Sequence, residues 1–217
     1  EFIAWVIGRA DAARWTYAGR AEVFFDDTQI EVFGPTFEGA KINYNGDLAL
    51  SWQTLWFGPF LLAGELGSPG DVSAALSPWL RQYQPFWKDR ACDFLADSGS
   101  SRAAQLRDID AAGFTHWSVS YNKWTSVPER TAAALPESAW SAAEETRWRD
   151  GTAVTEHHAG IRHTPAESDC SFTLAVARWK KADDLFWRYS FVAHEGRRTD
   201  AGAVLARHRL KGGKEQM

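Results

Sequence analysis

Runs of apolar residues that end in acidic residues mark the first predicted strands of the chain. Residues 21–25 form a short run of β-favouring residues that leads into Asp26 and Asp27. Residues 29–34 alternate polar and apolar side chains, as a half-buried strand does, and residues 48–57 form a third apolar run. These runs predict three consecutive strands, the first of which ends in carboxylates.

Helical and strand patterns alternate in the next part of the chain. Residues 72–83 and 102–112 have apolar positions at helical spacing, and residues 115–121 predict a strand. Between the helices, residues 92–97 form another apolar run that ends in Asp97. Three strands, a helix, a strand, a helix and a strand indicate an α/β fold, a mixed sheet flanked by helices whose first three strands form a meander.

The two runs that end in an acid are predicted to pair. We expect the strand containing residues 23–25 to lie beside the strand containing residues 94–96, because this brings Asp26 and Asp97 to neighbouring strand ends. In the alternative interpretation, both acids have only a structural role, as caps in the turns at strand ends.

The residue pattern of the chain changes in residues 122–197. Short runs rich in aromatic residues, Thr and Val recur there and favour strands. We predict a β-rich subdomain, inserted into a core made of residues 1–121 and 198–217, that packs beside the core sheet without extending it. After Thr199 the pattern is helical, with Asp200 as the expected N-cap.

Composition limits the class of protein. The chain has 217 residues, of which 45% are hydrophobic and 24% are charged, which is typical of a folded globular protein. The longest apolar stretch, residues 55–63, is far shorter than the roughly 20 residues of a membrane helix. Cys92 and Cys170 are isolated, which favours reduced thiols and a cytoplasmic protein. The chain stops without a helix stop signal, so we expect a longer C-terminal part.

Three carboxylates suggest a chemistry. Asp26, Asp97 and Glu215, near the end of the last predicted helix, form the kind of set that holds a pair of divalent cations roughly 4 Å apart for phosphodiester chemistry. The net charge of −4 argues mildly against a nucleic-acid partner, but residues 207–214 are locally basic.

Five short motifs occur in an order that resembles a known family. They are FDDT (25–28), KINYNG (41–46), LGSPGD (66–71), LADSG (95–99) and HRLKGGKE (208–215). Together they resemble the DDE transposases of bacterial insertion sequences, in the group with an all-β insertion before the last acid. The resemblance covers the chain from about Ala21 to Met217.

The resemblance implies a fold, an activity and a site. It implies a ribonuclease-H-like catalytic core that uses two Mg²⁺ or Mn²⁺ ions, held by Asp26, Asp97 and Glu215, for DNA strand cleavage and strand transfer. It also implies transposon ends and target DNA as partners, a dimer as the active form, and a nucleoid-associated protein of the bacterial cytoplasm. In this chain His208 and Lys211 stand where the family often carries Tyr and Arg.

The basic end of the chain is the predicted DNA contact. Arg207, Lys211 and Lys214 lie three or four residues apart and would form one stripe on a helix, with His208 beside them. We expect these four side chains to contact the DNA backbone near the cut. The alternative is a solvated helix face.

Three other functions remain open. A haloacid-dehalogenase-like phosphatase would need an aspartate nucleophile where this chain has Phe24. A catalytically degenerate, DNA-binding transposase fragment is compatible with the substitutions at His208 and Lys211. A zinc site built from His157, His158, His163 and Cys170 would have a ligand spacing that matches no known pattern.

Overall fold

A computed structural model describes residues 20–34, 36–43, 45–69, 73–121, 126–147, 151–165 and 168–211. The chain divides into two compact units, Glu1–Trp117 and Ser118–Met217. Within the described residues, no helix combines the length and the apolar character that crossing a membrane requires.

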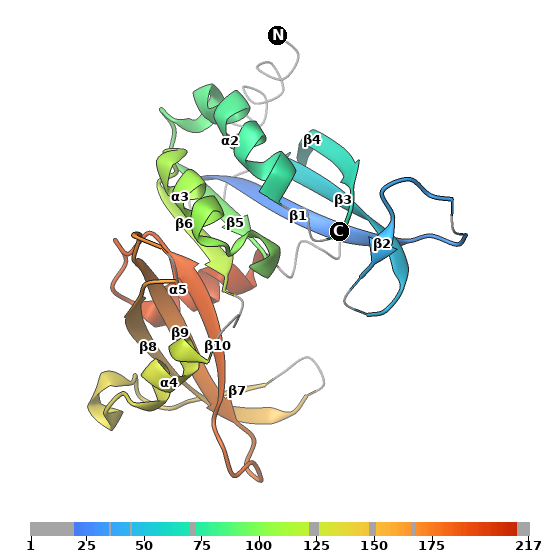
Figure 1. Ribbon diagram of the computed structural model, residues 1–217. Helices are drawn as coiled ribbons and strands as arrows, with labels where there is room; N and C mark the ends of the chain where they lie inside the picture. Colours follow the sequence, from blue (N-terminus) through green and yellow to red (C-terminus); the bar gives the residue numbers. More distant parts are fainter. Residues whose placement is uncertain are drawn as a thin grey trace. The chain divides into compact units, whose positions relative to one another are not determined.

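In its described residues, the first unit is a mixed sheet with helices α2 and α3 (Figure 1). Its strands follow the hydrogen-bonded order β2-β3-β1-β5, β4 also pairs with β3, and β6 comes after β5 in this order. The elements are β1 (Ala21–Glu31), β2 (Lys41–Ile42), β3 (Leu48–Phe57), β4 (Phe60–Gly67), α2 (Ser73–Trp87), β5 (Cys92–Ala96), α3 (Ala103–Ala111) and β6 (His116–Ser120), which spans the boundary of the two units.

Strand β1 continues through the two acids, so the separate second strand predicted at residues 29–34 is wrong. Its antiparallel ladder with β3 runs unbroken from the pair Val23↔Phe57 to the pair Glu31↔Ala49. The chain does not turn at Asp26 and Asp27. Each carboxylate instead accepts a hydrogen bond from a side chain of this sheet, which stabilises the acids within the strand. The third strand of the meander is β4, which the sequence pattern did not predict. It follows a tight turn in which Gly58 has a φ of 53°.

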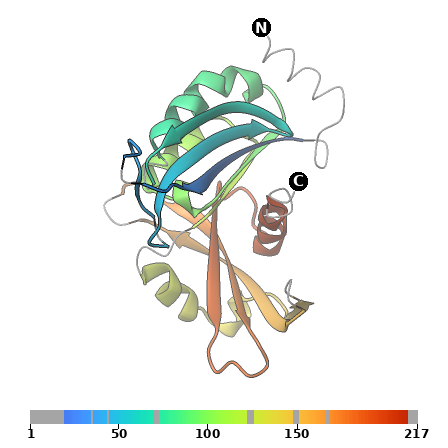
Figure 2. The ribbon, with the colours of Figure 1, turned by 90° about the vertical axis from the view of Figure 1, so that its right-hand side faces the viewer.

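Helix α2 lies against the sheet (Figure 2). Aromatic side chains make this contact. The ring centroids of Phe25 on β1 and Trp79 on α2 are 6.2 Å apart. Trp87 stacks on Phe114 at 5.1 Å, and Phe114 stacks on Phe94 of β5 at 5.0 Å. Both tryptophans of α2 are buried, so they belong to the hydrophobic core, which offers no ring face to a ligand.

The second unit is mainly β, as predicted for residues 122–197, although α4 interrupts that region. Its strands follow the order β6-β10-β9-β8-β7. The elements are α4 (Val127–Ala133), a 3₁₀ turn (Glu137–Ala139), β7 (Glu144–Arg147), β8 (Ala153–His163), β9 (Phe172–Lys180), β10 (Arg188–His194) and α5 (Ala201–Arg209).

The β-rich region extends a predicted core strand, which corrects the expectation that it would only pack beside the sheet. Strand β10 pairs antiparallel with β6 from Val192↔Ser120 to His194↔Ser118. The edge of β6 carries unpaired backbone groups until another strand covers it, and β10 satisfies them. Tyr121 continues this contact by donating its backbone N–H to the Phe191 carbonyl at 2.8 Å.

Helix α5 packs on strands β8, β9 and β10 (Figure 2). Asp200 caps it as predicted, and its side chain accepts a hydrogen bond from the backbone N–H of Ala203 at 3.2 Å. Small residues on the strands let the helix approach closely. The buried cluster at this contact contains Ala175, Ala177, Val192, Val204 and Leu205.

Candidate functional site

The two predicted acids come directly after the last parallel pair of strands β1 and β5. Strands β1 and β5 are in parallel register up to the pair Phe25↔Ala96, and Asp26 and Asp97 come one residue later on each strand. Asp97 still has extended backbone angles, with φ −83° and ψ 177°. Because matched residues of a parallel pair point to the same face, the two carboxylates share one face of the sheet. The predicted pairing of these strands is therefore confirmed.

Both acids remain open to solvent. The Asp97 side chain is exposed and that of Asp26 is half-buried. Asp26 Oδ2 accepts a hydrogen bond from Thr28 Oγ1 at 3.1 Å, which orients the carboxylate along the strand. Beside Asp26, Phe24 stacks on Trp56 of β3 at 5.8 Å, so an apolar ring pair borders the acidic edge on this face.

The neighbouring Asp27 lies on the other face. Its carboxylate accepts hydrogen bonds from Ser51 Oγ and from Gln29 Nε2, the latter at 3.3 Å. Burial raises the pKa of Asp27 above its ordinary value, the Ser51 hydrogen bond opposes this, and the charge of Asp26 adds to the increase. Asp27 is therefore held by two side chains of the sheet, on the face that Asp26 does not share.

The residues predicted to contact DNA are placed differently from an open stripe. His208 on α5 is buried, and its ring nitrogens lie 3.0 Å from Ser118 Oγ and 2.8 Å from Ser120 Oγ of β6. Lys211 is only 4% exposed, and Arg207 is partly buried. In the unbound chain Lys211 is therefore not part of a solvated helix face.

The third predicted ligand is on the last segment of the chain. Glu215 and the predicted DNA contact Lys214 lie outside the described residues. Within the described ranges, no group of three His, Cys, Asp or Glu side chains is arranged to hold a metal ion. Asp26 and Asp97 thus form two thirds of the predicted set, and the role of Glu215 stays a prediction.

The histidines of the zinc hypothesis have separate hydrogen-bond partners. His157 Nδ1 lies 2.9 Å from the Ser141 carbonyl, and His163 Nε2 lies 3.0 Å from Tyr121 Oη. His158 is paired with Glu156. In the part of the chain that the structure describes, these rings and Cys170 do not form a metal-binding group.

A buried charged network on β8 was not expected from the sequence. Glu156, 3% exposed, lies 2.5 Å from His158 Nε2 and 2.8 Å from the guanidinium of Arg209 on α5. Burial alone would raise the pKa of Glu156, but the hydrogen bonds from His158 and Arg209 lower it to about 2. A signal was available, because Glu156 and His158 are two residues apart and hence on one face of a strand. Their partner Arg209 is 53 residues away and could not be inferred.

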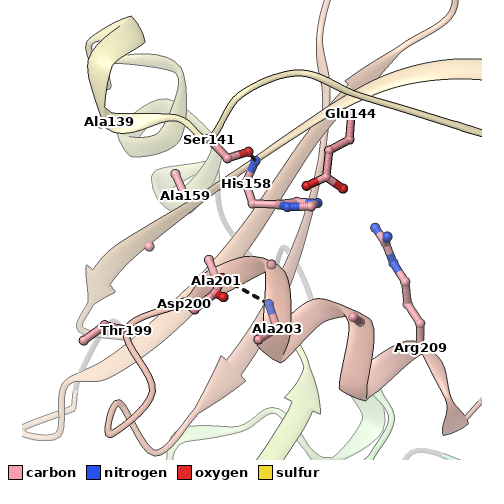
Figure 3. A pocket seen from close by; sticks show the side chains of 13 residues that line it. Ala139, Ser141, Glu144, His158, Ala159, Thr199, Asp200, Ala201, Ala203 and Arg209 are labelled. Carbon is pink, nitrogen blue, oxygen red and sulfur yellow. Dashed lines mark hydrogen bonds between the residues drawn. The ribbon is translucent and has the colours of Figure 1, made fainter.

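This network borders a cavity of about 550 Å³ in the second unit (Figure 3). Strand β8, residues 139–144 and the segment from Thr199 to Arg209 form its walls. Small side chains of the 139–144 segment and of α5 leave the space open. The polar lining residues are Ser141, Glu144, His158, Thr199, Asp200 and Arg209.

No protein-family model and no curated protein matches the chain.

Proposed function

We propose that this chain is the catalytic core of a DNA transposase of the DDE type, with a ribonuclease-H-like fold. The observation that carries the proposal is the register of β1 and β5, in which Asp26 and Asp97 each follow the last parallel pair, Phe25↔Ala96. Asp26 within β1 and Asp97 directly after β5 are held by the sheet, as metal ligands in phosphoryl transfer need to be. The five ordered motifs give the acids their family context.

The residues present are suited to divalent cations. Mg²⁺ binds through a few carboxylates and keeps several waters, so its ligands need solvent access. Asp97 is exposed and Asp26 is half-buried, whereas Asp27 lies on the other face and is hydrogen-bonded to Ser51 and Gln29. Asp26, Asp97 and Glu215 would hold two Mg²⁺ or Mn²⁺ ions. These ions would activate the attacking oxygen and stabilise the leaving oxygen of a DNA strand.

The chain's own groups have simpler tasks in this proposal. Thr28 fixes the orientation of the Asp26 carboxylate by its hydrogen bond. The basic end of the chain, from Arg207 to Lys214, holds the DNA backbone near the cut. The partners are transposon ends and target DNA, the active form is a dimer, and the setting is the bacterial cytoplasm.

Strand cleavage by the full-length protein tests the proposal. Supercoiled plasmid carrying the element ends should be nicked in Mg²⁺ or Mn²⁺ and should stay intact in EDTA. Binding without nicking under all metal conditions would identify a degenerate, DNA-binding fragment instead. Hydrolysis of a chromogenic phosphate ester without action on DNA would support a phosphatase.

The salt dependence of DNA affinity tests the proposed backbone contact. Each phosphate contact releases counterions, so Arg207→Ala and Lys211→Ala should each reduce the slope of log affinity against log salt by roughly one. For Lys211, which is 4% exposed, this result requires its side chain to become accessible when DNA binds. An unchanged slope together with a lower Tm would instead assign Lys211 to the fold.

A further inference from the structure

His158 presents an unused ring nitrogen to the cavity of the second unit. The residue is 9% exposed, and its Nε2 is paired with Glu156 at 2.5 Å. Within the described residues, Nδ1 of His158 has no hydrogen-bond partner. Figure 3 shows the ring in the cavity, with the Glu144 carboxylate on one side and the Arg209 guanidinium beyond it. This nitrogen is therefore available to a molecule in the cavity.

The chemistry of that nitrogen follows from its neighbours. The Glu156 carboxylate is ionised and accepts a hydrogen bond, so His158 Nε2 carries the proton. In the neutral ring, Nδ1 is then a hydrogen-bond acceptor facing the cavity. Arg209 is neutralised by Glu156, whereas Glu144 has no partner among the described residues. The unpaired charge of the cavity is therefore negative.

Gly202 of α5 lies close to the His158 ring, where a larger residue would not fit. A Cβ atom added at Gly202 would lie 2.9 Å from His158 Nδ1 and 3.3 Å from Asp200 Oδ1. Glycine at this position on α5 therefore leaves a cradle between an imidazole acceptor and a carboxylate. By contrast, a Cβ added at Gly160, which also lines the cavity, would have no atom within 4 Å.

We propose that this cavity binds a primary ammonium group, which donates a hydrogen bond to His158 Nδ1 and is balanced by the carboxylates of Glu144 and Asp200. An ammonium has three donors and no acceptor, which matches this set of acceptors. The main rival is an anion at the N-terminus of α5. Against it, Asp200 already places a carboxylate there and accepts from the Ala203 N–H, and Glu144 adds a second negative charge.

Two sources could supply the ammonium group, namely a free small amine and a lysine side chain of another copy of this chain. The cavity of about 550 Å³ is large enough for either, and both would use the same acceptors. The inference is independent of DNA cleavage, so it stands or fails separately from the proposed function.

Calorimetric titration of the full chain with 1,4-diaminobutane tests the proposal, with inorganic phosphate as the comparison ligand. We expect saturable binding of the diamine and none of phosphate. Gly202→Ala fills the cradle and should weaken diamine binding about tenfold, as losing one charge-assisted hydrogen bond does. Gly160→Ala, the matched control, should change the Kd by less than about twofold, since its added methyl group meets nothing.

A second variant protects the test against misfolding of Gly202→Ala. Glu144 is exposed, so Glu144→Gln should keep the fold and still weaken diamine binding. Sizing across a concentration series separates the two sources, because a lysine from another copy would give association that Gly202→Ala abolishes. Diamine heats that do not saturate together with sizing profiles that do not change, preferential phosphate binding, or equal Kd values for Gly202→Ala and Gly160→Ala would each overturn the inference.

Discussion

Asp26→Ala and Asp97→Ala are each expected to reduce metal-dependent DNA nicking by on the order of a thousandfold or more. Each change removes one of the two carboxylates that β1 and β5 bring to a common edge, so a cation that the pair holds is lost or misplaced. Glu215→Ala should have the same effect if the last helix supplies the third ligand. The measurement is the rate of nicking of supercoiled plasmid at saturating Mg²⁺ and at saturating Mn²⁺.

The matched control for these variants is the adjacent acid. Asp27→Ala removes a carboxylate of the same strand, but one that faces the other side and bonds to Ser51 and Gln29. It should keep most of the nicking activity and lower the Tm. Asp26→Ala and Asp97→Ala should retain DNA affinity, because binding depends on phosphate contacts. Normal nicking by either variant, or activity lost only in Asp27→Ala, would contradict the assignment of the site.

The sequence pattern predicted the order of strands and helices better than it predicted which residues form each strand. Strands, a helix, a strand, a helix and a strand do follow one another, but four strands precede α2 where three were predicted, and the meander consists of β1, β3 and β4. The acids of β1 resembled a turn because Asp is uncommon inside strands. The structure keeps them in the strand by giving Asp27 a partner on β3, a contact between residues 24 positions apart. Such partners are invisible to a local pattern.

In the candidate site, too, features that depend on local sequence were predictable and features that depend on distant partners were not. The positions of Asp26 and Asp97 were predictable because each residue follows an apolar run. Pairing these two runs as neighbouring parallel strands is enough to bring the two acids together. The role of His208 was not predictable, because its partners Ser118 and Ser120 are 90 and 88 residues away. Spacing on a helix indicated which residues share a face. Whether a strand covers that face depends on tertiary contacts, here with β6.

Glu156→Ala is expected to lower the free energy of unfolding by about 2–4 kcal/mol. The carboxylate is 3% exposed and joins His158 of β8 to Arg209 of α5, so its removal leaves a buried imidazole and a half-exposed guanidinium without their partner. Chemical denaturation followed by tryptophan fluorescence measures the change. The control is Glu144→Ala, the directly opposite residue on β7, which should change stability by no more than about 0.5 kcal/mol.

Acid should reproduce part of this loss in the wild-type chain. The pKa of Glu156 is lowered from 4.5 to about 2 in the fold, so the carboxylate stabilises the folded state above the unfolded value. That stabilisation, about 3 kcal/mol for a shift of this size, is lost as the pH falls from 4.5 towards 2. Glu156→Gln should be less stable than wild type at pH 7, and the gap should close over this window. The unfolding free energies of the two proteins could instead differ by a constant amount from pH 7 down to pH 2. That result would show that protonation of Glu156 does not affect the stability of the second unit.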